Sequence, residues 1–248
     1  MSTLQQPLRP LRVALLVPSS NTVMENDLHR ALPKDQFTVH TGRMFLTETT
    51  REQEIRMIED FAPKAASDLG TLEPDVLVFG CTSAGSLFGM EYDAQVCQKL
   101  GSLAQCEAIG VISTVAQALA EANFKRVAII TPYNEDLTQS VAKAVEKEVT
   151  VVGAWGMGIT HNVALADPTP EEIVAFAKSK LSGVVFDGLF VSCTNFRSFE
   201  AKALLEQTFG VPVVTSNMTI NGPGAVLKRV STAPPFRHFL VGAGGNLT

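Results

Sequence analysis

The chain has 248 residues, of which 46% are hydrophobic and 18% are charged, and its formal net charge is −5. This composition is sufficient for a substantial core, as one large domain or two smaller ones, and it argues against disorder. The acidic balance argues against nucleic acid as a partner, because phosphate binding needs a basic face.

The chain lacks the signals of membrane insertion and of disulfide or zinc stabilisation. No apolar run approaches the ~20 residues that a membrane-spanning helix needs. The stretch from Met1 to Pro10 is polar and lacks the apolar segment of a signal peptide. We therefore expect a cytoplasmic protein without membrane contact. Four cysteines with no Cys-x-x-Cys and no Cys/His cluster predict reduced thiols and no structural metal.

Apolar runs and turn residues predict strands and helices that alternate along the chain. Strands are expected at residues 11–17, 37–40, 76–79, 109–112, 126–130, 149–154, 188–191 and 211–214. Helices are expected at residues 23–31, 50–70, 92–102, 114–123, 135–147, 170–181, 199–209 and 216–228, followed by a tail. Pro63 interrupts the second helical pattern, so we expect a kink or break there.

Near-continuous apolar strands alternating with helices indicate an α/β fold with parallel sheets covered on both faces. Three segments recur in the same order, which indicates a duplicated unit. The matching pairs are residues 13–18 with 127–132, 78–83 with 190–195, and 109–114 with 211–216. We therefore expect two pseudo-equivalent doubly wound domains, residues 1–115 plus 216–248 and residues 116–215. The active site is expected in the cleft between them.

Cys81 and Cys193 occupy matching places, each after an apolar strand and before a small-residue turn. Backbone amides and a helix N-terminus at such a sheet edge favour a thiolate. Each cysteine could instead be a small buried filler. Their matched placement favours two thiols that face one substrate, one attacking or deprotonating it and the other supplying a proton. Cys97 and Cys106 lack this placement and are interpreted as structural.

Polar residues at the same edge are further candidates. Asn21 follows the first strand and is equally well explained as a helix cap. Tyr133 follows the matching strand of the second half, where core packing with a satisfied hydroxyl is the alternative. Asn162 lies in a loop and alone would be a weak candidate.

Other motifs point away from cofactor chemistry. No Gly-rich phosphate loop stands between a strand and a helix, so a nucleotide is not expected. The histidines belong to no nucleophile–base motif and are interpreted as structural or surface residues: His29, His40, His161 and His238.

These residues resemble the aspartate/glutamate racemase superfamily and, more narrowly, its maleate cis–trans isomerases and arylmalonate decarboxylases. The resemblance covers nearly the whole chain. Besides the cysteines, it rests on Val17 to Glu25, Arg43-Met44, Thr131-Pro132-Tyr133 and Asn162-Val163-Ala164. Arylmalonate decarboxylases keep only the second cysteine, whereas this chain has both. That difference favours isomerase or racemase chemistry.

The resemblance implies a mechanism that needs no cofactor. The Cys81 thiolate would add to the double bond of maleate, the succinyl adduct would rotate, and Cys193 would act as acid and base before fumarate leaves. The two carboxylates of this small dicarboxylate would be held by a set of polar groups: Asn21, Tyr133, Asn162, Thr82, Ser83 and Thr194. The resemblance also implies a dimer or higher homo-oligomer.

Three alternatives to maleate isomerisation stay open on the sequence. The protein could be a two-thiol racemase of an amino acid or hydantoin, which solvent deuterium exchange at the α-carbon would reveal. It could be a decarboxylase of substituted malonates, for which Cys81 should be dispensable. It could also be a small-acid binding protein with inert thiols.

Overall fold

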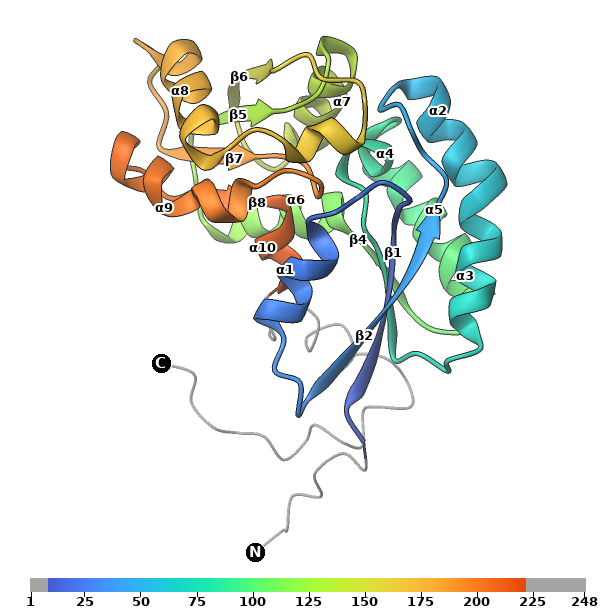
Figure 1. Cartoon of the computed structure of the whole chain (residues 1–248). Coiled ribbons are helices and arrows are strands. Elements are labelled where there is room, and N and C mark those ends of the chain that lie inside the picture. The colour runs from blue at the N-terminus through green and yellow to red at the C-terminus, as the bar shows by residue number, and fades with distance from the viewer. Residues whose placement is uncertain (1–8, 222–248) are drawn as a thin grey trace, which may run out of the picture.

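Within residues 9–221, the part of the chain that the structure describes, eight strands form two parallel four-stranded sheets (Figure 1). The structure is a computed structural model. The first sheet has the order β2-β1-β3-β4, with β1 (Leu11–Pro18), β2 (Phe37–Met44), β3 (Val76–Phe79) and β4 (Ala108–Gly110). The second has the order β6-β5-β7-β8, with β5 (Val127–Thr131), β6 (Val151–Gly156), β7 (Gly188–Val191) and β8 (Val213–Thr215). The predicted α/β class with two parallel sheets is confirmed.

Helices connect successive strands, as parallel pairing requires. In the first half they are α1 (Met24–Ala31), α2 (Arg51–Arg56), α3 (Ala62–Gly70), α4 (Thr82–Ser86), α5 (Met90–Ala104) and α6 (Val111–Glu121). In the second half they are α7 (Glu135–Val145), α8 (Pro170–Leu181), α9 (Ser198–Phe209) and α10 (Ser216–Asn221). A π-helical segment, η1 (Met57–Phe61), joins α2 to α3, and a short 3₁₀ helix, η2 (Val163–Ala166), follows β6.

The two sheets have the same internal order, and the sequence repeats map onto it. The strand β1 corresponds to β5, β3 to β7 and β4 to β8, because each pair occupies the same position in its sheet. These are the three pairs of segments that matched in the sequence. The carboxyl ends of the parallel strands lie at one edge of each sheet, so Cys81 and Cys193 lie just beyond equivalent strand ends.

The last helix of each half packs against the other half. Helices α3 and α5 cover one face of the first sheet, while α1 and α6 lie on the other (Figure 1). Helix α6 follows β4 but also contacts α7 and β8. Helix α10 follows β8 but contacts α1 and α6. The halves therefore share an interface made of exchanged helices.

The predicted domain boundaries stay a prediction. The boundary between residues 115 and 116 falls inside α6. Residues 1–8 and 222–248 of the first predicted domain lie outside the described residues, and so do His238, the predicted tail and the predicted helix beyond residue 221.

The helix around Pro63 is interrupted as expected, because η1 replaces α-helical hydrogen bonding over the turn before this proline. Along α2 and η1, Glu54 and Met57 are fully buried, whereas Ile55 is only half-buried.

Two other sequence predictions were wrong in detail. Helix α4 was not predicted, because all five of its residues are small or polar and all are buried, which leaves no apolar periodicity. Residues 109–112 were predicted as a strand, but β4 ends at Gly110 and Val111 begins α6. Both segments are buried, and a short apolar run does not distinguish a buried strand from the first turn of a buried helix.

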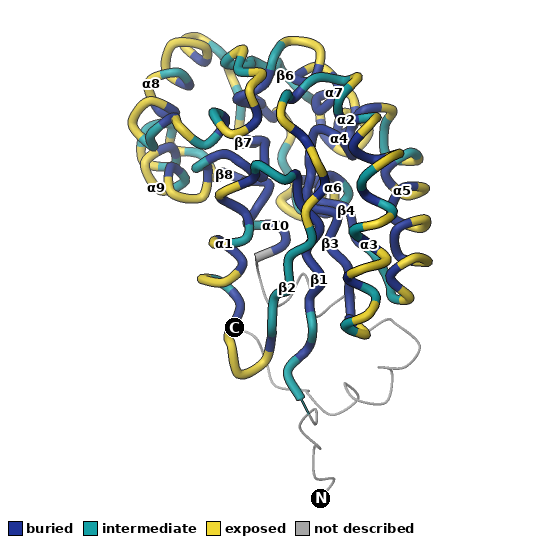
Figure 2. The backbone as a smooth tube through the Cα atoms, turned by 45° about the vertical axis from the view of Figure 1, so that its right-hand side comes forward, coloured by how far each residue is buried: buried dark blue, intermediate teal, exposed yellow. Residues whose placement is uncertain are grey.

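Burial is concentrated along the strands and in the loops that follow them. Figure 2 shows the central strands in dark blue and the outer helical faces in yellow. The largest fully buried side chains include Phe79 and Phe190, at the ends of β3 and β7, and Tyr133 after β5. Among residues 9–221, no helix is long and apolar enough to cross a membrane.

Candidate active site

The first thiol lies between β3 and α4. Cys81 has an extended backbone conformation and directly precedes the first turn of α4, where the backbone N–H of Ala84 acts to lower the pKa of the thiol. Cys81 Sγ also lies 3.7 Å from Ser83 Oγ. The side chain is only 4% exposed.

The second thiol lies beyond β7 on a strained backbone. Cys193 has φ of 113°, a conformation that only glycine adopts without cost. Its sulfur accepts a hydrogen bond from the backbone N–H of Asn195 over 3.2 Å. The Tyr133 hydroxyl also donates to this sulfur. Backbone strain of this kind clusters at functional sites.

A backbone amide acts on each thiol, as the sequence predicted. The pKa of each thiol is nevertheless raised, whereas the prediction was a lowered pKa that favours the thiolate. Burial raises the pKa of Cys81 well above its ordinary value, and the nearby Glu54 carboxyl raises it further. Burial raises the pKa of Cys193 to about 12, against the opposing effect of the Tyr133 hydrogen bond. Desolvation of a buried anion outweighs the amides in each case. Both cysteines are therefore thiols at neutral pH, and a thiolate forms only if a nearby base takes the proton.

A buried carboxyl group that the sequence analysis missed lies beside the first thiol. Glu54 on α2 is fully buried, and its Oε1 accepts a hydrogen bond from the Ser83 hydroxyl. Burial raises the pKa of Glu54 to about 8. Its sequence signal is a charged residue at helical spacing from Ile58 and Ala62, both of which are buried.

Asn21 links the end of β1 to the loop of the second thiol. Its Oδ1 accepts hydrogen bonds from the backbone N–H groups of Val23 and Met24, so it caps the start of α1 as the structural interpretation predicted. Its Nδ2 donates to Thr194 Oγ1 over 3.1 Å. The Thr194 hydroxyl in turn donates to the Gly80 carbonyl, 3.0 Å away in the loop of the first thiol. One chain of hydrogen bonds thus holds both cysteine loops.

Asn162 belongs to a second bridge between the halves. Its Nδ2 donates to Ser20 Oγ over 2.7 Å, and its Oδ1 accepts from the Thr49 hydroxyl. Its carbonyl accepts from the side chain of Asn195, whose Oδ1 receives the backbone N–H of Thr22. The loop after β6 is therefore fastened to the first half and to the Cys193 loop.

Ser216 joins the two thiol segments directly. Its hydroxyl oxygen accepts hydrogen bonds from Thr82 Oγ1, at 2.9 Å, and from the backbone N–H of Cys193, at 3.0 Å. Ser216 is fully buried at the start of α10. The sequence analysis did not single it out, because its importance depends on a contact between residues far apart in the chain.

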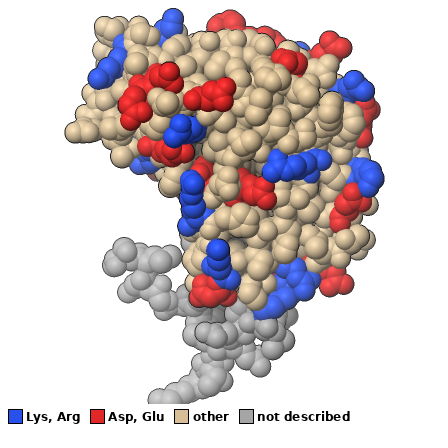
Figure 3. Space-filling view, in the orientation of Figure 1, with Lys and Arg blue, Asp and Glu red and all other residues tan. Residues whose placement is uncertain are grey.

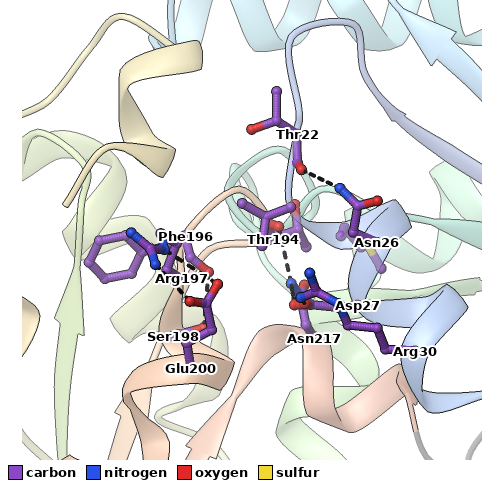
Figure 4. Close-up of polar contacts among 12 residues, drawn as sticks. Thr22, Asn26, Asp27, Arg30, Thr194, Phe196, Arg197, Ser198, Glu200 and Asn217 are labelled. Carbon is purple, nitrogen blue, oxygen red and sulfur yellow. Dashed lines mark hydrogen bonds and ion pairs between the residues drawn. The ribbon is translucent and has the colours of Figure 1, made fainter. Parts of the chain in front are cut away.

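Figure 4 shows the flank of the Cys193 loop, where α1 and α10 meet it. The side-chain amide of Asn217 donates to Asp27 Oδ2 and to the Thr194 carbonyl. The Arg197 guanidinium donates to Glu200 Oε2 over 2.7 Å, so its charge is paired with a carboxylate at the surface.

The eight predicted site residues occupy one region of the molecule. The pKa of Tyr133 is raised, first by burial and then by the charges of Cys193 and Cys81, which places this hydroxyl near both sulfurs. The hydroxyls of Thr82, Ser83 and Thr194 each donate to a protein acceptor. The other predicted members, Asn21 and Asn162, are also buried.

The remaining candidates lie elsewhere or are absent. Cys97 is buried on α5, and none of the four cysteines, all within the described residues, forms a disulfide. His161 is an exposed partner of Glu48. Within residues 9–221, no group of three or more Cys, His, Asp and Glu side chains could hold a metal ion. On the face in Figure 3, basic and acidic side chains are interspersed and form no large basic patch.

Comparison with protein families decides the relationship. The family model for arylmalonate decarboxylase matches residues 13–233. The chain belongs to this family. One relative of the chain is a maleate isomerase from Pseudomonas putida. The two are 30% identical over 253 residues, which cover 96% of this chain and 97% of the relative. The family lies within the aspartate/glutamate racemase superfamily. Because relatives of the chain are maleate isomerases, the chain is an enzyme of the isomerase class.

Solved structures of this family share the fold. A cysteine-to-alanine variant of a Pseudomonas putida maleate isomerase with maleate superposes with a TM-score of 0.79, at 23% identity, over 91% of this chain and 95% of that chain. A cysteine-to-serine variant of the Nocardia farcinica maleate cis–trans isomerase, with a covalently bound succinylcysteine intermediate, superposes with a TM-score of 0.78 at 22% identity. The match covers 90% of this chain and 95% of that chain.

Proposed function

We propose that this isomerase converts maleate to fumarate, with Cys81 as the nucleophile and Cys193 as the proton donor and acceptor. The observation that carries the proposal is a pair of buried thiols beyond equivalent strand ends, one with a hydroxyl 3.7 Å from its sulfur and the other with a backbone N–H donated to its sulfur. The substrate comes from the maleate isomerases to which the chain is similar.

In the proposed reaction, the Cys81 thiolate forms a carbon–sulfur bond to one olefinic carbon, and the π bond breaks. The other olefinic carbon takes the proton of Cys193, which leaves a succinyl thioether and a Cys193 thiolate. The central carbon–carbon bond is now single and rotates. Cys193 then removes a proton from that carbon, the carbon–sulfur bond breaks, and fumarate leaves with Cys81 again a thiolate. Protons and electrons balance without an external reactant. The mechanism is covalent catalysis by one thiol with the other thiol as the acid–base partner.

The residues around the thiols supply the electrostatics for this chemistry. We propose that Asn21, Tyr133 and Asn162 hold the two carboxylates. We expect help from the amides and hydroxyls of three neighbouring residues: Thr82, Ser83 and Thr194. Dipoles of this kind act strongly in a site that excludes water.

The presence of Cys81 separates this proposal from the decarboxylase alternative. The arylmalonate decarboxylases that the sequence resembles keep only the second cysteine. In this chain the first cysteine is present and buried, directly before the first turn of α4. A thiol at this place is what a covalent succinyl adduct needs.

The test is to incubate the purified protein with maleate at millimolar concentration and follow fumarate by proton NMR. Formation of fumarate in the presence of a chelator supports both the substrate and cofactor independence. An inactive protein that releases carbon dioxide from an arylmalonate would instead support decarboxylation. Exchange of an α-proton with solvent deuterium, with loss of optical rotation, would support racemisation.

We also infer from the family resemblance that the protein is a homo-oligomer, and we keep the expectation from the sequence that it is cytoplasmic. Light scattering on the purified chain tests the oligomeric state, and a monomer at micromolar concentration would contradict it. Fractionation of cells that express the chain tests the compartment.

A further inference from the structure

Glu54 occupies an unusual position for a carboxyl group. It is fully buried, yet no arginine or lysine among residues 9–221 forms an ion pair with it. Its Oε1 accepts a hydrogen bond from Ser83, while its buried Oε2 has no hydrogen-bond partner within the described part of the chain. A buried polar atom without a partner costs stability, so its presence calls for an explanation.

The nearest cation is directed elsewhere. Arg51 lies one turn earlier on α2 and lowers the pKa of Glu54 only at a distance. Its guanidinium binds Asp136 and the Ser140 hydroxyl on α7, and the Leu87 carbonyl. The groups that share an electrostatic interaction with Glu54 are Arg51, Asp136, Cys81, Tyr92, Tyr133 and Cys193.

A continuous path joins this carboxyl group to the first thiol. Cys81 Sγ lies 3.7 Å from Ser83 Oγ, and the same hydroxyl donates to Glu54 Oε1. A hydroxyl both donates and accepts, so it can pass a proton between two neighbours. Cys193 has no equivalent, because its sulfur is contacted by the Asn195 amide and the Tyr133 hydroxyl, both of which donate.

We propose that Glu54 is the proton acceptor that activates Cys81, through the hydroxyl of Ser83. The step starts from ionised Glu54, the form that predominates above its pKa of about 8. The Cys81 S–H bond breaks and its proton passes to Ser83 Oγ, while the Ser83 hydroxyl proton passes to Glu54. The products are a Cys81 thiolate, an intact Ser83 hydroxyl and a neutral Glu54, so the net charge of the trio is unchanged. The proton returns by the same path when the catalytic cycle ends.

This step solves one problem of the proposed isomerisation, on which it rests for the substrate. The buried Cys81 thiol needs a base, because its pKa is raised by burial. The Glu54 carboxylate supplies that base, and the transfer moves its negative charge to the sulfur that attacks the substrate.

The first experiment measures the reactivity of Cys81 without any substrate. The purified protein is treated with iodoacetamide across a range of pH, and alkylation of the Cys81 peptide is followed by mass spectrometry. In the wild type we expect the rate to rise with a midpoint near the Glu54 pKa of about 8. In Glu54→Gln the midpoint should move upward by more than about one pH unit, which lowers the rate at neutral pH by about tenfold or more.

Matched variants separate proton transfer from packing. Asp93→Asn is the control, since Asp93 is equally buried and burial raises its pKa to about 7, but it lies on α5 away from the sulfur contacts. Its midpoint should equal that of the wild type. Glu54→Asp should restore part of the reactivity. Ser83→Ala should reproduce Glu54→Gln, and the double variant should be no worse than either single one.

Turnover of maleate gives the second readout. Glu54→Gln should lower kcat by about 100-fold, the scale of general acid–base catalysis, with little change in KM. Ser83→Ala keeps the test available if Glu54→Gln fails to fold. An unchanged alkylation profile in both variants would overturn the inference even if the wild type isomerises maleate. A protein that ignores maleate but shows the shifted Cys81 profile would overturn the substrate and support the relay.

Discussion

The two thiol segments occupy the same place in two sheets of the same order, but they differ in what surrounds them. Cys81 has an extended backbone and is followed at once by a helix, with a hydroxyl and a buried carboxyl group near its sulfur. Cys193 has a strained backbone, and the next helix, α9, begins only at Ser198. Its neighbours are hydrogen-bond donors.

This difference shows how a duplicated fold can hold two unequal groups. The strands set the position of each cysteine, and the segments that follow set its chemistry. A thiol beside a base is suited to attack, whereas a thiol surrounded by donors is suited to receive and return a proton at one place. The asymmetry of roles, which the sequence supplied only through a family resemblance, thus has a physical counterpart in the contacts of each sulfur.

The largest expected effect is the loss of either thiol, and the two losses should differ in kind. Cys81→Ala should lower turnover by about 10⁴-fold or more and prevent any covalent adduct. Cys193→Ser should lower turnover to a similar extent but allow a succinyl adduct on Cys81, visible by intact-protein mass spectrometry. Cys97→Ala, at another buried site, should keep turnover. Adducts on Cys193 in the Cys81 variant would reverse the assigned roles.

The next effect concerns the donor that Cys193 has and Cys81 lacks. Tyr133→Phe removes a hydroxyl whose hydrogen bond lowers the pKa of Cys193. Hydrogen bonds to charged groups contribute ~1.5–3 kcal/mol, so kcat should fall by about 10-fold to 100-fold. Steady-state kinetics measures this. Tyr92→Phe changes the other tyrosine of the chain and should have no comparable effect; equal losses in both variants would remove Tyr133 from the site.

A third prediction concerns stability and the buried carboxyl group of the first segment. Burial raises the pKa of Glu54 from 4.5 to about 8. Between these values the folded protein binds more protons than the unfolded chain, so its free energy of unfolding falls as pH rises through this window.

In the variant Glu54→Gln the side chain at this position cannot ionise. The variant should therefore keep the part of the free energy of unfolding that the wild type loses when Glu54 ionises. Above pH 8 it should be more stable than the wild type, although less active. Urea unfolding at several pH values measures the difference. If the wild type and Glu54→Gln lose stability in parallel, Glu54 is not buried as a neutral acid.

The smallest effect tests the backbone difference itself. Cys193 has φ of 113°, so Cys193→Gly should be more stable than Cys193→Ala by about 1 kcal/mol. Cys81 has φ of −140°, so the order should reverse there, with glycine less stable than alanine by ~0.5–1 kcal/mol. Chemical unfolding of the four variants gives the comparison. The same order at both positions would mean that the strain at Cys193 is not real.

Much of the frame could be predicted from the sequence where local signals agree. The limits of β3, β7 and α8 were predicted correctly. The two strands are apolar runs, β3 between Asp75 and Gly80 and β7 between Asp187 and Ser192. Helix α8 has Thr169 as its N-cap, with a complete capping box and a proline in its first turn. The repeats located the equivalent strands, and therefore both cysteines.

What escaped prediction depends on contacts across the duplication or on a charged residue in an apolar stripe. Ser216 and Asn195 acquire their roles from partners in distant segments, which one sequence does not reveal. Glu54 is buried at helical spacing from Ile58 and Ala62, on the side of the segment that faces the core. A carboxyl group on an apolar stripe was a usable signal that the sequence analysis did not use.

The junction between the loops after β2 and β6 has a consequence for how this protein can diverge. Thr49 N–H donates to the Thr160 carbonyl over 2.6 Å, and Asn162 N–H donates to the Thr47 carbonyl over 2.8 Å. These bonds belong to the main chain, so they persist when side chains at this rim are replaced. Under the proposed role of Asn162 in holding a carboxylate, substitutions at this rim would change which acids bind while the backbone hydrogen bonds between the two loops persist. On that proposal, the junction offers natural variation, or a mutant library, a place to alter substrate preference without disrupting the fold.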